Sequence, residues 1–133
     1  SDITASRNQL LQDRDWYIAL TNIKVEANTD WSGSPNIITG AESSTLFTNE
    51  WSTAKNYHTL PTAVAWLTYT FYVADSDWIR VVADTWNFIL VNWVSSTSAW
   101  YCDSISIWSS ITLTAINATD WVATSSIGTR TLG

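Results

Sequence analysis

Residues 63–74, with the sequence AVAWLTYTFYVA, decide the fold class of this chain. Apolar side chains alternate there with hydroxyl-bearing and aromatic ones, and this period of two places successive side chains on opposite faces of a β-strand. One predicted face carries Leu67, Tyr69, Phe71 and Val73, and the other carries Trp66, Thr68, Thr70 and Tyr72. The segment therefore predicts a half-buried strand whose first face lies in the core.

Strand-like segments also lie on both sides of this one. We expect them at 15–27, 37–39, 45–48, 78–83, 86–94, 99–107, 110–117 and 121–126, with a bulge near residues 21–22. Residues 86–94 are apolar on both faces, which predicts a central strand. Short strands separated by frequent turns predict an all-β fold, either a single-domain antiparallel sandwich or a jelly-roll-like barrel, with about seven to nine strands.

The two ends of the chain differ from this strand-rich body. The length of 133 residues is that of one domain. We divide it into an N-terminal arm or short helix at 1–14, a β domain at 15–126 and a C-terminal tail at 127–133. Ser6 and Gln9 have the spacing of a helix capping box. Terminal segments of this kind either pair with neighbouring subunits and lock them together or fray at the ends of the domain, and composition does not decide between the two.

Two segments have a less direct interpretation. The polar stretch 49–59 predicts a loop that holds one helical turn and ends before Pro61. Five tryptophans recur every seven or eight residues, at Trp78, Trp86, Trp93, Trp100 and Trp108. Because β-branched and hydroxylated residues lie between them, we expect one tryptophan per strand of a meander and not a helical heptad. Glycine occurs only 4 times, which is few for a chain with so many expected turns.

The charge balance excludes some classes of partner. Lys and Arg number 6 and Asp and Glu 12, so the net charge is −6. Nucleic-acid binding proteins and proteins that bind anionic membranes need a basic patch, and we expect neither partner here. The longest apolar run, residues 81–94, is too short and too polar to be a membrane helix.

Catalytic motifs are missing from the sequence, and we expect no enzyme. His58, the single histidine, stands in a polar stretch, where we expect an ordinary loop residue. Glu26, Glu42 and Glu50 belong to no recognisable motif. Cys102 is the single cysteine, so we expect a small buried hydrophobic residue and no disulfide.

Metal binding has little support in the sequence. Asp75 and Asp77 form a D-x-D pair, and Asp84, Asp103 and Asp120 are expected near strand ends. Calcium needs six to eight oxygen ligands, and no complete loop motif supplies them. We interpret Asp75–Asp77 as a hairpin turn and expect no cofactor, with calcium as the weaker alternative.

The tryptophans give the best indication of function, because ten indoles exceed what one small core accommodates. Trp31, Trp51 and Tyr57 lie in polar segments and, with Trp100, are our candidates for an interface or for ligand stacking. We expect a non-enzymatic structural subunit of a virus particle, phage tail or extracellular filament, a homo-oligomer or larger assembly held by aromatic contacts. The alternative is a carbohydrate-binding module in which the rings stack on sugars and Asp30 and Asn49 bind their hydroxyls.

Overall fold

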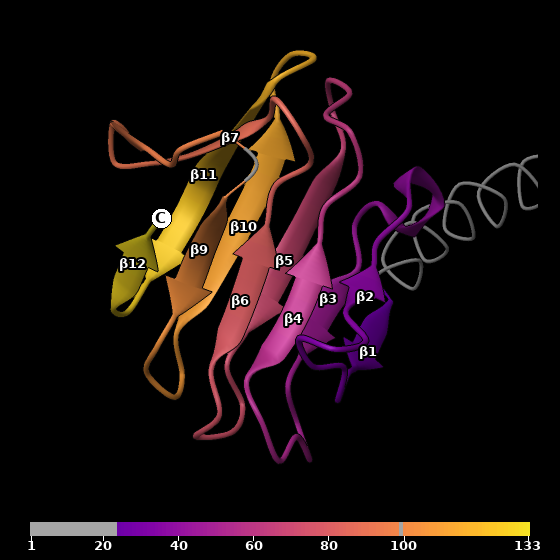
Figure 1. The fold of residues 1–133 in the computed structure, drawn as a ribbon, viewed down its shortest axis with the longest axis vertical. Helices are drawn as coiled ribbons and strands as arrows, with labels where there is room; N and C mark the ends of the chain where they lie inside the picture. Colours follow the sequence, from indigo (N-terminus) through magenta and orange to yellow (C-terminus); the bar gives the residue numbers. More distant parts are fainter. Residues whose placement is uncertain (1–23, 99) are drawn as a thin grey trace, which may run out of the picture.

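The computed structural model describes residues 24–98 and 100–133, and these form two β-sheets stacked face to face (Figure 1). The larger sheet has the strand order β1-β3-β5-β10-β11-β7-β8, and the smaller has the order β12-β9-β6-β4-β2. The strands are β1 (Val25–Ala27), β2 (Asn36–Ile37), β3 (Leu46–Thr48), β4 (Asn56–Thr59), β5 (Thr68–Tyr72), β6 (Ile79–Val82), β7 (Phe88–Val91), β8 (Val94–Ser95), β9 (Tyr101–Ser104), β10 (Ser110–Ala115), β11 (Asp120–Ile127) and β12 (Arg130–Leu132).

The first six strands alternate between the two sheets as the chain advances. Within the larger sheet β1, β3 and β5 are parallel, and Leu46 pairs with both Val25 and Thr70. Within the smaller sheet β2, β4 and β6 are also parallel. The chain therefore winds as a two-layer coil, in which each strand pairs with the one two places further along. From β7 onwards both sheets gain antiparallel pairs, such as β10 with β5 and β9 with β6.

The core lies between the sheets and follows from strand alternation. In β5, Tyr69 and Phe71 are fully buried while the residues between them are partly exposed. The partner strand β10 buries Ile111 and Leu113 in the same way. On the opposite face of this sheet, Thr70 of β5 forms a hydroxyl hydrogen bond of 2.9 Å with β10. In these two strands the hydrophobic face thus turns inward, and the hydroxyl face turns outward.

The all-β sandwich is confirmed, and its sheets are mixed where we expected antiparallel ones. Parallel pairs arise because the chain crosses to the other sheet between β3 and β5 and between β4 and β6. The segment 86–94 is not central: β7 has only β8 beyond it at the sheet edge, and the chain turns at Asn92 and Trp93. The segment 49–59 is not the loop with a helical turn that we expected, since it contains the strand β4. Its alternation was hidden because the two residues that face the core, Asn56 and His58, are polar.

The chain ends also differ from our expectation. Residues 127–133 are not a separate tail, since β12 pairs with β9 and completes the smaller sheet. The predicted arm at 1–14 lies outside the described residues, as does most of the segment 15–27. The evenly spaced tryptophans do not lie one per strand of a meander, as we expected. They lie in turns or just before strands, so their spacing reflects the turns between short strands. Within the described part of the chain, the helical structure is a single 3-10 turn at Gly40–Glu42.

Candidate functional site

Tryptophans at the surface form two groups that differ in backbone conformation. Trp121 is fully buried, and the other eight described tryptophans are exposed. The first group has a positive backbone angle φ and consists of Trp51, Trp66, Trp86, Trp93 and Trp108. The second group, Trp31, Trp78 and Trp100, has no positive φ and is less exposed, at 40–55%. The core therefore holds one of the nine described indoles.

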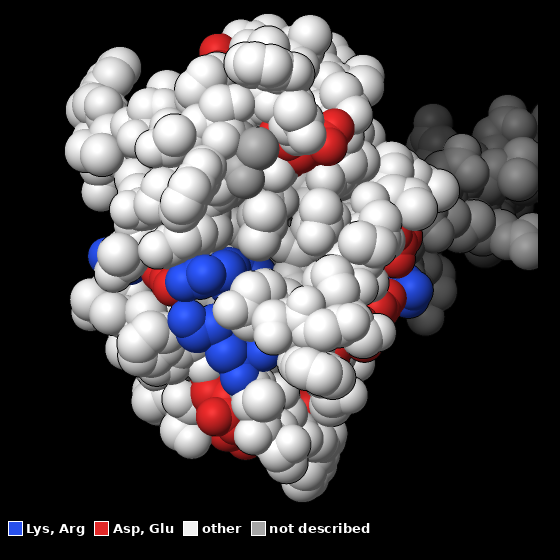
Figure 2. All heavy atoms as spheres, in the orientation of Figure 1, with Lys and Arg blue, Asp and Glu red and all other residues white. Residues whose placement is uncertain are grey.

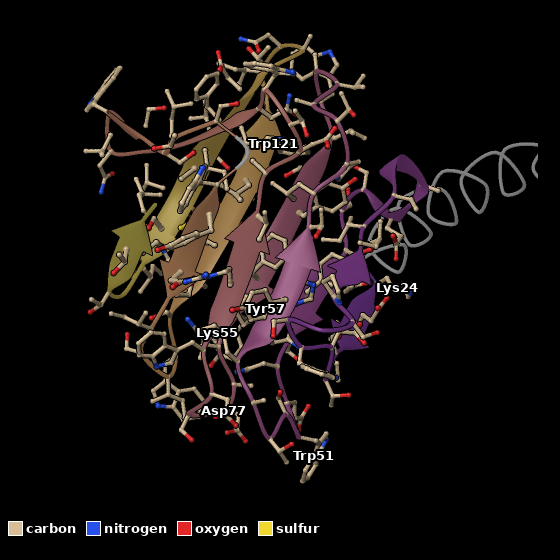
Figure 3. All side chains as sticks on the ribbon, viewed as in Figure 1. Lys24, Trp51, Lys55, Tyr57, Asp77 and Trp121 are labelled. Atoms are coloured by element: carbon tan, nitrogen blue, oxygen red, sulfur yellow. The ribbon has the colours of Figure 1, made fainter. Side chains whose placement is uncertain are left out.

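The structure does not bring the predicted aromatic residues into one row. Tyr57 lies on the outward face of β4 near the middle of the smaller sheet, while Trp51 lies at the tip of a loop (Figure 3). Trp31 belongs to the loop whose Asp30 carbonyl accepts a hydrogen bond from the Tyr57 amide. Trp100 precedes β9, where its carbonyl oxygen accepts from Ala83, just beyond the end of β6. Trp51 and Trp100 thus belong to different ends of the sandwich.

Asn49, which we predicted to bind the hydroxyl groups of a sugar, has no polar side-chain atom left for a ligand. It is fully buried, and its Oδ1 accepts hydrogen bonds from the backbone amides of Ala74 and Asp75, at 2.8 and 3.0 Å. Its Nδ2 donates to the carbonyl oxygens of Asp75 and Asp77. Asn49 therefore organises the bend at 75–77, which joins β5 to β6 in the other sheet and is not the hairpin turn that we predicted. Asp30, the other residue that we predicted to bind sugar hydroxyls, is half-buried. Its backbone carbonyl oxygen accepts a hydrogen bond from the Tyr57 amide on β4.

A charged and aromatic cluster on the outward face of the smaller sheet was not predicted. The guanidinium of Arg80 binds both carboxylate oxygens of the buried Asp103, through two hydrogen bonds of 2.7 Å. The same guanidinium lies 3.5 Å from the ring centroid of Tyr101 and 5.5 Å from that of Tyr57. We call Tyr57, Arg80, Tyr101 and Asp103 the Arg80 cluster. Neighbouring strands β4, β6 and β9 supply it, so it depends on their register.

Two exposed tryptophans extend this cluster. Trp78 lies under the Lys55 ammonium, which is 4.6 Å from its ring centroid and 3.4 Å from the Asp103 carboxylate. The ring of Trp100 lies 6.1 Å from that of Tyr101. Lys and Arg atoms gather at the centre of this face, and acidic atoms lie below them (Figure 2). The hydrogen bonds to Asp103 raise the pKa of Arg80 above its usual value, so the cation is permanent.

His58 is a core residue and not the loop residue we expected. It is fully buried on β4, and burial lowers its pKa to about 3. Its Nε2–H donates to Asn56 Oδ1, and its Nδ1 accepts from Asn36 at 3.1 Å. The neutral imidazole thus has both nitrogens engaged. Cys102 is buried as expected, and burial raises the pKa of its thiol to about 11.

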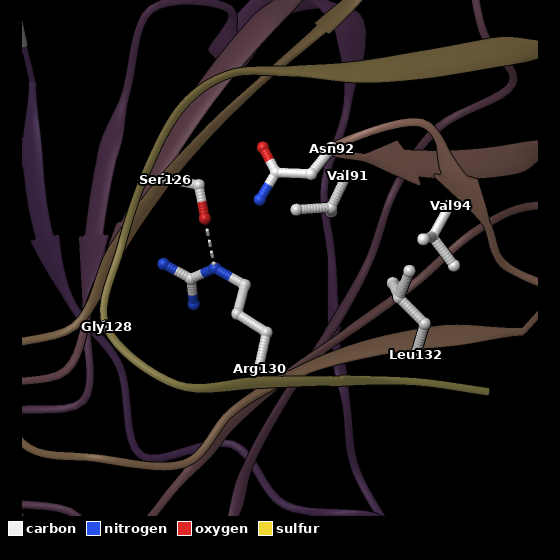
Figure 4. Close-up of a pocket in the computed structure, with 7 residues that line it drawn as sticks. All are labelled: Val91, Asn92, Val94, Ser126, Gly128, Arg130 and Leu132. Atoms are coloured by element: carbon white, nitrogen blue, oxygen red, sulfur yellow. Dashed lines mark hydrogen bonds between the residues drawn. The ribbon is translucent and has the colours of Figure 1, made fainter.

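A pocket of about 450 Å³ lies between the β7–β8 hairpin and the β11–β12 hairpin (Figure 4). Its charged residue is Arg130, which donates to Ser126, at 2.8 Å, and to Ser104. The guanidinium also donates to the carbonyl oxygens of Ser110 and Ile127. Ser104 belongs to the smaller sheet, whereas Ser110 and Ile127 belong to the larger one. The Arg130 guanidinium therefore links the two sheets through its hydrogen bonds.

Metal-binding groups do not converge in the part of the chain that the structure describes. Asp103 is bound to Arg80, and Asp120 accepts a hydrogen bond from Asn117. Among the same residues there is no helix with the length and hydropathy needed to cross a bilayer. No family model matches this sequence, and no curated protein matches it either.

Proposed function

We propose that this chain is a non-enzymatic structural subunit that associates with further copies of itself, in a virus particle or an extracellular assembly. The observation that carries the proposal is the Arg80 cluster, an arginine fixed between two tyrosines on an outward sheet face. Tyrosine, tryptophan and arginine are the residues that most often dominate the energy of protein–protein contacts.

The cluster is held in one arrangement before any partner arrives. Two hydrogen bonds to Asp103 and the ring of Tyr101 fix the Arg80 guanidinium. Arginine side chains otherwise lose considerable rotamer freedom when they are buried in a contact. A guanidinium that is already ordered costs less entropy on association, so this face is suited to binding another protein.

The charge of the chain favours a second copy as the occupant. Arg80 and Lys55 both contact the Asp103 carboxylate and bring two positive charges to this face, whereas the whole chain carries a net charge of −6. A basic centre on an acidic protein is complementary to acidic surfaces of another copy. Trp78 and Trp100 lie next to the cluster and supply apolar area around it.

A non-enzymatic role is supported by the state of the buried reactive groups. His58 has both ring nitrogens engaged by asparagine side chains. Cys102 is inaccessible, and its raised pKa keeps the thiol protonated at neutral pH. A catalytic base or nucleophile needs access to a substrate, which neither residue has.

Sedimentation velocity over a range of concentrations tests the proposal. We expect the protein to form larger species with rising concentration and Tyr57→Ala to shift this association to at least tenfold higher concentration. The matched control is Tyr72→Ala, which removes a half-buried tyrosine from the outward face of the other sheet and should leave association unchanged. A monomer at all concentrations, or equal effects of the two substitutions, would contradict the proposal.

A glycan array with the same protein tests the alternative function. The carbohydrate hypothesis requires binding that depends on Trp31 and Tyr57. Self-association without glycan binding supports the structural subunit. Glycan binding by a protein that stays monomeric would replace our proposal with the carbohydrate-binding one.

A further inference from the structure

Five tryptophans occupy a backbone conformation that favours glycine. Trp51, Trp66, Trp86, Trp93 and Trp108 have φ between 64° and 81°. For an L-residue with a bulky side chain this left-handed region brings Cβ close to the following carbonyl oxygen, so such residues are rarely found there. Glycine has no Cβ and adopts the conformation without this cost. The true glycine Gly128 has a φ of 96°.

Four of these tryptophans occupy the same position in the same kind of turn. In each, the amide that follows the tryptophan donates to the carbonyl oxygen three residues earlier. The four hydrogen bonds are Ser52 to Asn49, Leu67 to Val64, Asn87 to Asp84 and Ser109 to Ser106. Tryptophan is therefore the third of four turn residues each time. A positive φ at that position is the mark of a type II turn, which selects glycine there.

The fifth tryptophan lies in the two-residue hairpin between β7 and β8. Asn92 and Trp93 have φ values of 49° and 70°, and the flanking residues Val91 and Val94 pair with each other. Positive φ at both central residues defines the hairpin turn for which Asn-Gly is the preferred sequence. Here the sequence has Asn-Trp in its place.

The five indole side chains make few contacts that could offset the strain of their left-handed backbone conformation. Their side chains are 64–101% exposed, with Trp93 fully in solvent. None of their indole N–H groups donates a hydrogen bond within the described residues, and Trp108 alone contacts another aromatic ring, that of Tyr72. The steric cost of one such residue, taken five times, is comparable to the whole stability of a typical domain. A functional display of strained tryptophans at five separate turns is therefore disfavoured on energy.

We infer that positions 51, 66, 86, 93 and 108 are glycine positions and that the organism that makes this protein inserts glycine at them. A single cause accounts for both the excess of tryptophan and the shortage of glycine, which number 10 and 4. The codon UGA specifies tryptophan in some genetic codes and glycine in others, so one reassigned codon would place glycine at all five turns. Trp121 on β11 has no positive φ and its side chain is fully buried in the core, so the same reasoning makes it a true tryptophan.

Peptide mass spectrometry of the protein isolated from its own organism tests the inference directly. We expect glycine at the five positions and tryptophan at position 121. We also expect one shared codon at the five positions, different from the codon for Trp121. Peptides that contain tryptophan at the five positions would overturn the inference.

Equilibrium unfolding of single variants gives a second, independent test. We expect Trp93→Gly and Trp66→Gly each to raise the folding equilibrium constant about fivefold, because glycine relieves the left-handed backbone. The matched controls are Trp78→Gly and Trp100→Gly, exposed tryptophans without a positive φ, and these should lower the constant. Equal effects in the two groups would overturn the inference. The Arg80 cluster contains none of the five positions, so the self-association test stands apart from this one.

Discussion

The ring of His58 lies 5.1 Å from the ring of Phe47, so an imidazole occupies a place in the hydrophobic core. The two residues belong to different sheets, and Phe71 contacts the same imidazole at 5.2 Å. A charged imidazole would lose its hydration in this position, and only the neutral form fits the hydrogen bonds from Asn36 and to Asn56.

Acid should therefore destabilise the protein through His58. The pKa of His58 is about 3 in the folded protein and 6.5 in the unfolded chain. Since the pKa is lower in the folded protein, the contribution of neutral His58 to the unfolding free energy is complete above pH 6.5. It is lost as the pH falls from 6.5 towards 3. We expect a slope of up to about 1.4 kcal/mol per pH unit in this window. Urea unfolding of the protein and of His58→Gln at several pH values measures this slope. If the unfolding free energies of the two proteins change with pH in the same way, His58 is not the group responsible.

The turn at residues 75–77 should depend on Asn49. Asn49→Ala leaves the amides of Ala74 and Asp75 without their acceptor, and we expect a loss of about 2–4 kcal/mol of unfolding free energy. Chemical denaturation measures the loss. The control is Asn117→Ala, which removes an exposed side chain from another turn and should cost less. A cost for Asn49→Ala below that of the control would contradict the role given to this residue.

Arg80 and Asp103 should be energetically coupled. Their two charge-assisted hydrogen bonds predict a coupling free energy of roughly 1.5–3 kcal/mol. A double-mutant cycle with Arg80→Ala and Asp103→Ala, followed by denaturation, measures it. Additive effects would show that the pair does not act as one unit, and the preordering argument for the face would then fail.

The thiol of Cys102 should be unreactive in the folded protein. It has no exposed surface, and burial raises its pKa to about 11. We expect thiol reagents at neutral pH to label it only as fast as the protein unfolds, and immediately in denaturant. Labelling in native buffer at the rate of a free thiol would contradict its placement in the core.

The sequence predicts strands well where one face is hydrophobic and the other is not. Residues 68–72 and 110–115 follow the alternation and form β5 and β10. The segment 49–59 was misinterpreted because Asn56 and His58 are polar yet buried, and only the fold shows that they satisfy each other. The Arg80 cluster depends on the register of three strands, which no local pattern contains. Alternation in 79–82 shows only that Arg80 faces outward.

The shortage of glycine was visible in the sequence, but its meaning required the backbone. Without φ values, the tryptophans in turns resemble ligand-binding residues. The structure separates Trp51, which has a positive φ, from Trp31 and Trp100, which do not. Sequence reasoning had placed these three tryptophans in one candidate site.

Electron cryo-microscopy of the assembled material is the most direct test of the central claim, that copies meet through the Arg80 cluster. We predict density for a second copy over Tyr57, Arg80 and Tyr101, with Trp78 and Trp100 at the margin of the contact. An assembly in which this face is open to solvent, or particles that remain single copies, would contradict the claim.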